Sequence, residues 1–191
     1  MREETFISVD IEADGPVPGM HSMLSLGACV AGEPERSFYV ELRPISDDFV
    51  PEALAVSGLD RRRLFDEGTP PADAMASFRI WVASVAGNAR PVFVSFSSWD
   101  WVFVYYYLIR FGGASPFGHA SLDIKSFYLG RCGGSWVGTG KRSIAKTQPE
   151  LLRGLGPHTH HALDDAREQG ELFRRILTRA VGPNAEQAHH G

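Results

Sequence analysis

The stretch TFISVDIEADG, residues 5–15, decides the fold, because it ends an apolar run with two acids. Its β-branched and aromatic residues favour a half-buried β-strand. Side chains alternate between the faces of a strand and rise about 3.3 Å per residue, so we expect Asp10 and Glu12 to point the same way, roughly 7 Å apart. Two like charges beside a core are costly unless a cation balances them. The pattern therefore predicts a cation close to both acids.

Length and composition favour one soluble α/β domain. The chain has 191 residues, of which 43% are hydrophobic and 22% charged, as in an ordinary globular protein. We expect one domain over residues 1–182 and a polar tail over 183–191. Cys29 and Cys132 lack zinc-site spacing, which favours a reducing, cytoplasmic location. The longest apolar run, 101–109, is far below the ~20 residues of a membrane span, so no membrane contact is expected.

The net charge of −4 argues against a protein that coats nucleic acid through phosphate neutralisation alone. It leaves room for a nucleic-acid enzyme that gathers acids around metal ions while local cations hold the strand. The runs GLDRRRLF (58–65) and GTGKRSIAK (138–146) offer such cations. The alternative for each run is an ordinary solvated surface.

The rest of the chain predicts two more strands, then alternating helices and strands. The second and third strands are joined by a turn at 32–35 and form an antiparallel meander with the first. Strand–helix pairs follow, which suggests parallel crossovers. The expected strands are 5–12, 22–32, 36–44, 89–96 and a short one ending near Asp123, the expected helices are 70–85, 97–113 and 161–181, and 130–140 is expected to be a loop.

Two further acids are predicted in the first turns of helices. Asp100 lies on the core-facing stripe of the helix 97–113, and Asp165 lies at the seam between the final helix and the sheet. Helix capping is the alternative explanation for both. Ser97-x-x-Asp100 resembles a capping box, and an acid in a first turn complements the helix dipole.

A histidine precedes the final helix and is free to point toward the same place. The segment HTHHALDD, 158–165, offers His158, His160 and His161, and it pairs Asp164 with Asp165. The residues alone leave the choice among them open. If the acids converge, they need divalent cations, and Mg²⁺ or Mn²⁺ bound in pairs can assist displacement at a phosphodiester.

The ordered motifs resemble the DEDDh 3′-to-5′ exonucleases, which include proofreading subunits, oligoribonuclease and ribonuclease T. FISVDIEADG is similar to their first motif, D-x-E, and VFVSFSSWDWVFV to the second, with its acid just after a strand. HHALDDA is similar to the third, H-x-x-x-x-D, whose spacing pairs His160 with Asp165. The resemblance spans about residues 5–178.

This resemblance implies a ribonuclease-H-like α/β fold, a five-stranded mixed sheet with an antiparallel meander, then parallel strands, and helices on both faces. It implies that Asp10, Glu12 and Asp165 bind one Mg²⁺ or Mn²⁺, and that Asp10 bridges to a second ion contacted by Asp100. His160 is the implied general base. The implied reaction releases 5′-mononucleotides from the 3′ end of single-stranded DNA or RNA.

The chain departs from the family at positions expected near the terminal nucleotide. Ala13 and Asp14 follow the first Glu where relatives carry Thr-Gly, and Phe96 replaces a frequent Asn. We expect Ala13, Asp14, Trp99 and Trp101 to contact substrate, because the tryptophans flank Asp100 and aromatic rings stack on bases. The other aromatic residues of this helix are expected in the core. Asp123 is expected to be structural.

Two other functions stay open from the residues. A nucleic-acid or protein-binding module could keep the fold without chemistry. An endonuclease or another phosphoesterase could use the same acids. The choice between DNA and RNA depends on contacts to the 2′-hydroxyl, which a motif does not place. A homodimer, for which the aromatic Trp136 is a natural contact, is also left open.

Overall fold

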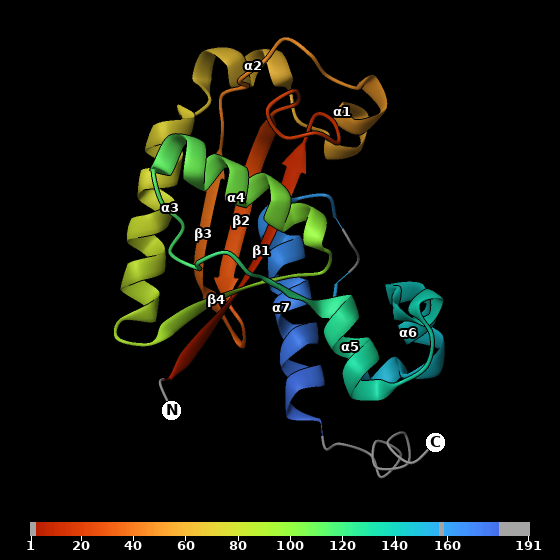
Figure 1. Ribbon diagram of the computed structural model, residues 1–191. Helices are drawn as coiled ribbons and strands as arrows, with labels where there is room; N and C mark the ends of the chain where they lie inside the picture. Colours follow the sequence, from red (N-terminus) through yellow and green to blue (C-terminus); the bar gives the residue numbers. More distant parts are fainter. Residues whose placement is uncertain (1–2, 157–158, 180–191) are drawn as a thin grey trace.

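The structure, a computed structural model, describes residues 3–156 and 159–179. Its centre is a five-stranded sheet with the order β3-β2-β1-β4-β5 (Figure 1). β2 pairs antiparallel with β1 and β3, whereas β4 runs parallel to β1 and β5 parallel to β4. This confirms the predicted meander followed by parallel strands. The strands are β1 (Glu4–Ala13), β2 (Met23–Val30), β3 (Glu33–Glu41), β4 (Arg90–Ser95) and β5 (Leu122–Asp123).

Helices cover both faces of the sheet, as predicted (Figure 1). One apolar cluster joins the sheet to α3 and α4, and a second joins the other face to α5, α6 and α7. The helices are α1 (Pro51–Ser57), α2 (Arg61–Glu67), α3 (Pro71–Ala86), α4 (Ser98–Gly112), α5 (Ile124–Cys132), α6 (Lys141–Thr147) and α7 (Ala162–Thr178), with short 3₁₀ turns η1 (Trp136–Thr139) and η2 (Pro149–Leu151).

The central strand β1 alternates between these two clusters. Ile7 and Val9 are fully buried in the cluster with α3 and α4. Phe6 points the other way and packs on Phe173 of α7, with ring centroids 5.1 Å apart. The alternation continues along the strand. It therefore directs Asp10 toward α7.

Two glycines let α7 lie directly on the sheet. A Cβ at Gly27 would stand 2.2 Å from the backbone nitrogen of Leu163, and a Cβ at Gly170 would stand 2.9 Å from Cβ of Ser8. These approaches require glycine. They bring the first turn of α7, which carries Asp165, over the end of β1.

The structure corrects two local expectations. β3 begins at Glu33 rather than Arg36, because Ala31 and Gly32 alone make the reversal and Gly32 adopts φ 87°. The segment 130–140, expected to be a loop, contains the end of α5 and the turn η1.

The predicted tail 183–191 and His158 lie outside the described residues. Within the described parts of the chain, every helix is too short or too polar to cross a membrane.

Candidate active site

The predicted catalytic residues meet at the end of β1. A cavity of about 760 Å³ is lined by Asp10 and Glu12 from β1 and by Asp100 from the first turn of α4. His160, from the segment before α7, lines the same cavity. Asp165 is 1% exposed, and its carboxylate lies within 4.8 Å of ligand atoms of Glu12 and His160. Residues scattered over most of the chain are thus brought to one place.

Burial and mutual repulsion raise the pKa values of three of these acids. Burial raises the pKa of Asp10 well above its usual range, and the neighbouring carboxylates of Asp100, Glu12 and Asp165 raise it further. Burial, followed by the charges of Asp165 and Asp100, raises the pKa of Glu12 to about 8. Burial raises the pKa of Asp100 to about 7. Since crowded carboxylates resist ionising together, a bound cation would stabilise their charged forms.

Asp100 both caps its helix and joins the other acids. The backbone at Ser97 and Ile11 favours the charged form of its carboxylate and so opposes the rise in its pKa. Ser97 is the N-cap residue of α4, but its own side chain makes no capping bond, so only the acid's half of the predicted capping box forms. Ile11 lies between Asp10 and Glu12 on β1. Asp100 therefore lies beside these two acids, with which it lines the cavity.

His160 differs from its neighbours in backbone conformation and in position. Its φ is 56°, a left-handed conformation that is strained for most residues and recurs at functional sites. The backbone N–H of the preceding Thr159 donates to Asp165 Oδ1 at 3.0 Å. This bond ties the segment that carries His160 to the acid at the start of α7.

The alternative pair, His161 and Asp164, faces away from the cavity. The ring of His161 stacks on Tyr39, with centroids 4.7 Å apart. The exposed carboxylate of Asp164 lies 3.5 Å from His161 and 3.7 Å from Arg167. The structure thus favours His160 with Asp165, which is the pair that the motif spacing selects.

The predicted substrate contacts divide into two groups. Ala13 and Trp99 line the cavity, and Trp99 is 40% exposed. The side chain of Asp14 does not reach it, contrary to the prediction. Its buried carboxylate accepts the backbone N–H of Ser22 at 2.6 Å and Arg61 Nε–H at 2.9 Å, so it serves the fold.

Trp101 is likewise a core residue rather than a substrate contact. It is 9% exposed and its ring packs on Phe93, with centroids 4.8 Å apart. The prediction treated the two neighbours of Asp100 alike. Trp101, however, is on the side of α4 that packs against the sheet. Asp123, expected to be structural, caps α5 by accepting the backbone N–H of Ser126 at 2.7 Å.

Sequence reasoning missed Gln169, which holds the site together. Gln169 Oε1 accepts the backbone N–H of Phe96 at 2.8 Å, and Nε2 donates to the carbonyl of Val9 at 2.8 Å. The side chain therefore joins α7 to β1 and to the residue that follows β4, beside the cavity. Its position four residues after Asp165, on the same face of a helix, is the signal that could have found it.

Comparisons with known proteins agree with this geometry. No family model matches the chain. The chain is 48% identical over 177 residues to the 3′-5′ DNA exonuclease Cap18 of Escherichia coli, which covers 91% of this chain and 92% of that protein. The nuclease domain of 3′hExo, a DEDDh family member solved with rAMP, has a TM-score of 0.73 at 14% identity over 93% of each chain. S. pombe Pop2p, solved with Mg²⁺ and Mn²⁺, has a TM-score of 0.65 at 17% identity over 91% of this chain and 83% of that chain.

The sheet, its helices and the acids at the end of β1 define a ribonuclease-H-like nuclease fold. The chain belongs to the DEDDh 3′-5′ exonuclease family and is a 3′-5′ exonuclease, as the motifs predicted. The family depends on divalent metal ions. Glu12, His160 and Asp165 offer ligand atoms within 4.8 Å of one another, and the carboxylate oxygens of the two acids suit hard cations.

Proposed function

We propose that the chain releases 5′-mononucleotides one at a time from the 3′ end of single-stranded DNA. Similarity to a relative named as a DNA exonuclease, along nearly the whole chain, supports DNA as the substrate. The cavity of about 760 Å³ has the size of a small-molecule site, which supports a single strand, because a terminal base pair would have to open before its nucleotide could enter.

Two Mg²⁺ or Mn²⁺ ions are the proposed cofactors. Asp10, Glu12 and Asp165 would hold one ion, and Asp10 and Asp100 the other. The donor set fits, because the raised pKa values of Asp10, Glu12 and Asp100 record a surplus of negative charge that cations relieve. When bound, such ions polarise the phosphate and stabilise the charge that develops on the attacking and leaving oxygens.

His160 is the proposed general base. Its imidazole lies within 4.8 Å of the carboxylates of Glu12 and Asp165, so it would stand beside a phosphate held by metal ions at these acids. From there it would accept the proton of the attacking water. The hydrogen bond from Thr159 to Asp165 keeps the segment in place, and Trp99 and Ala13 would contact the terminal nucleoside.

The observation that carries the proposal is the meeting of the acids of β1, α4 and α7 with His160 in one cavity. A substrate panel tests it, with linear and circular single strands of DNA and RNA and a DNA duplex, each with Mg²⁺ or with EDTA. We expect mononucleotides from linear single-stranded DNA with Mg²⁺ alone. Cleavage of circular DNA would show an endonuclease, and faster cleavage of RNA would refute the proposed substrate.

A further inference from the structure

One lysine stands among the acids of the cavity. Lys141, the first residue of α6, lines the cavity with its neighbour Arg142. Its charge lowers the pKa of Asp10, against the burial and the carboxylates that raise it. Sequence reasoning had left the run 138–146 as either a strand-holding group or a solvated surface. The structure distinguishes the cations of this run. Lys141 and Arg142 line the cavity, whereas Lys146 of the same helix is exposed and does not line it.

The ammonium group of Lys141 is held from two sides. Nζ forms a salt bridge with the carboxylate of Glu168, in which the side chains are 25% and 9% exposed. Nζ also lies 5.0 Å from the ring centroid of Phe96, within the range of a cation–π contact. Glu168 belongs to α7, three residues after Asp165. The helix that brings an acid to the site therefore also positions this cation.

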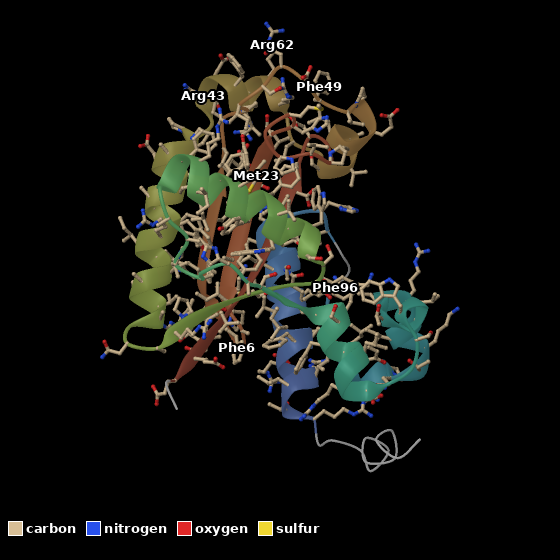
Figure 2. All side chains as sticks on the ribbon, in the orientation of Figure 1. Phe6, Met23, Arg43, Phe49, Arg62 and Phe96 are labelled. Atoms are coloured by element: carbon tan, nitrogen blue, oxygen red, sulfur yellow. The ribbon has the colours of Figure 1, made fainter. Side chains whose placement is uncertain are left out.

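Phe96 lies where β4 leads toward α4, beside α5 (Figure 2). Its backbone N–H is fixed by Gln169, and its ring lines the cavity beneath the ammonium group. Phe96 and the lysine thus form one element, an aromatic ring that seats a cation.

A charged strand creates a need for such a cation. The acids repel the phosphates of a nucleic acid, and ions bound between them would balance only the phosphate at the reacting bond. We infer that Lys141, assisted by Arg142, binds the phosphate next to the scissile one in the substrate strand. An ammonium has three N–H donors, so its salt bridge with Glu168 leaves donors for an oxygen in the cavity. This inference rests on the proposed function.

The competing explanation is that the pair of Lys141 and Glu168 only fastens α6 to α7. Binding and kinetics separate the two. Lys141→Met removes the charge and keeps much of the length, and Lys146→Met is the matched control on the same helix. The probe is a fluorescent single-stranded DNA oligomer with Mg²⁺, and affinity is measured over a range of salt concentrations in a His160→Ala background.

We expect Lys141→Met to weaken binding about tenfold, which corresponds to ~1.4 kcal/mol, and to lower the slope of log affinity against log salt by about 0.7. In the background with His160 intact, KM should rise about as much while kcat changes little. Lys141→Arg should restore most of the affinity, and Lys146→Met should match the parent. Glu168→Gln should give a smaller rise in KM, because the ammonium group stays but is less well positioned.

The results that overturn the inference differ from those that overturn the proposed function. If Lys141→Met keeps the parent affinity and salt slope, or if only its unfolding midpoint falls, the lysine is a fastening residue. Lys141→Gln serves as the second variant should the methionine variant not fold. If the parent protein cleaves none of the oligomers, the proposed function itself fails.

Discussion

Asp10 and Asp14 lie four residues apart in one stretch of chain, yet the fold treats them differently. The carboxylate of Asp14 is fully buried and is matched by Arg61 and a backbone N–H. The carboxylate of Asp10 is raised in pKa by burial and by other carboxylates, and Lys141 offsets this only in part. The two acids therefore differ in role. An acid paired with a cation is part of the scaffold, whereas a group of acids that repel one another is the proposed metal site.

The largest expected effect comes from Asp10→Asn. Loss of a shared metal ligand should lower kcat/KM on single-stranded DNA at least 10³-fold, or ~4 kcal/mol. The unfolding midpoint in EDTA should not fall, since the change removes repulsion from the cavity. Activity and thermal unfolding are measured on the same preparation. An activity within tenfold of the parent would mean that Asp10 is not a metal ligand, and its contrast with Asp14 would fail.

Asp14→Asn is expected to show the reverse pattern. Leaving Arg61 without its partner should lower the free energy of unfolding by about 3 kcal/mol, as for other broken buried pairs. Arg61 also contacts the ring of Phe49, which does not replace the lost charge. Urea unfolding measures the loss, and the gain in midpoint on adding Mg²⁺ should persist. If this variant lost the Mg²⁺ response and kept its stability, Asp14 would belong to the site.

The sequence predicted the sheet and the meeting of the four acids because both depend on local patterns. Residue spacing predicts the alternation in β1 and the positions of Asp100 and Asp165 in the first turns of their helices. The fold then brings the end of β1 and these two helix starts together. The choice of His160 over its neighbours needed the motif as well.

Partners distant in sequence could not be read in this way. Arg61, which balances Asp14, is 47 residues away, and the bond from Gln169 to Val9 spans 160 residues. Trp101 was misjudged for the same reason, because its burial depends on Phe93 and Phe117 as well as on Tyr105 of its own helix. Spacing thus predicts where acids and apolar stripes lie, while their counter-charges and packing partners require the assembled fold.

Glu12→Gln should change how stability depends on pH. The folded protein without metal holds the proton of Glu12 up to its pKa of about 8, whereas the unfolded chain loses it near the ordinary value of 4.5. The parent should therefore lose stability relative to Glu12→Gln as pH rises from about 4.5 to 8, and the two should agree below that range. The effect should be smaller than that at Asp14, because solvent in the cavity screens the charge.

Unfolding midpoints in EDTA between pH 4.5 and 8.5 measure this difference. Adding Mg²⁺ should stabilise the parent more at pH 8 than at pH 6, because metal binding requires ionised carboxylates. The glutamine variant should show a weaker response to Mg²⁺. Parallel curves for the two proteins in EDTA would mean that Glu12 ionises normally, and the site would then lack the charge surplus that distinguishes it from Asp14.

The smallest expected effect concerns the two tryptophans beside Asp100. Like Asp10 and Asp14, one of them lies at the cavity and the other serves the fold. Trp99 lines the cavity, with its ring 4.8 Å from that of Phe103, whereas Trp101 lies in the core. Trp99→Ala should raise KM about fivefold, or ~1 kcal/mol, at the low end for a base stacked on an aromatic ring. Trp101→Phe should leave KM unchanged and affect only unfolding. Equal KM values for all three proteins would place the terminal base elsewhere in the cavity, because a base stacked on Trp99 would bind more weakly without that ring.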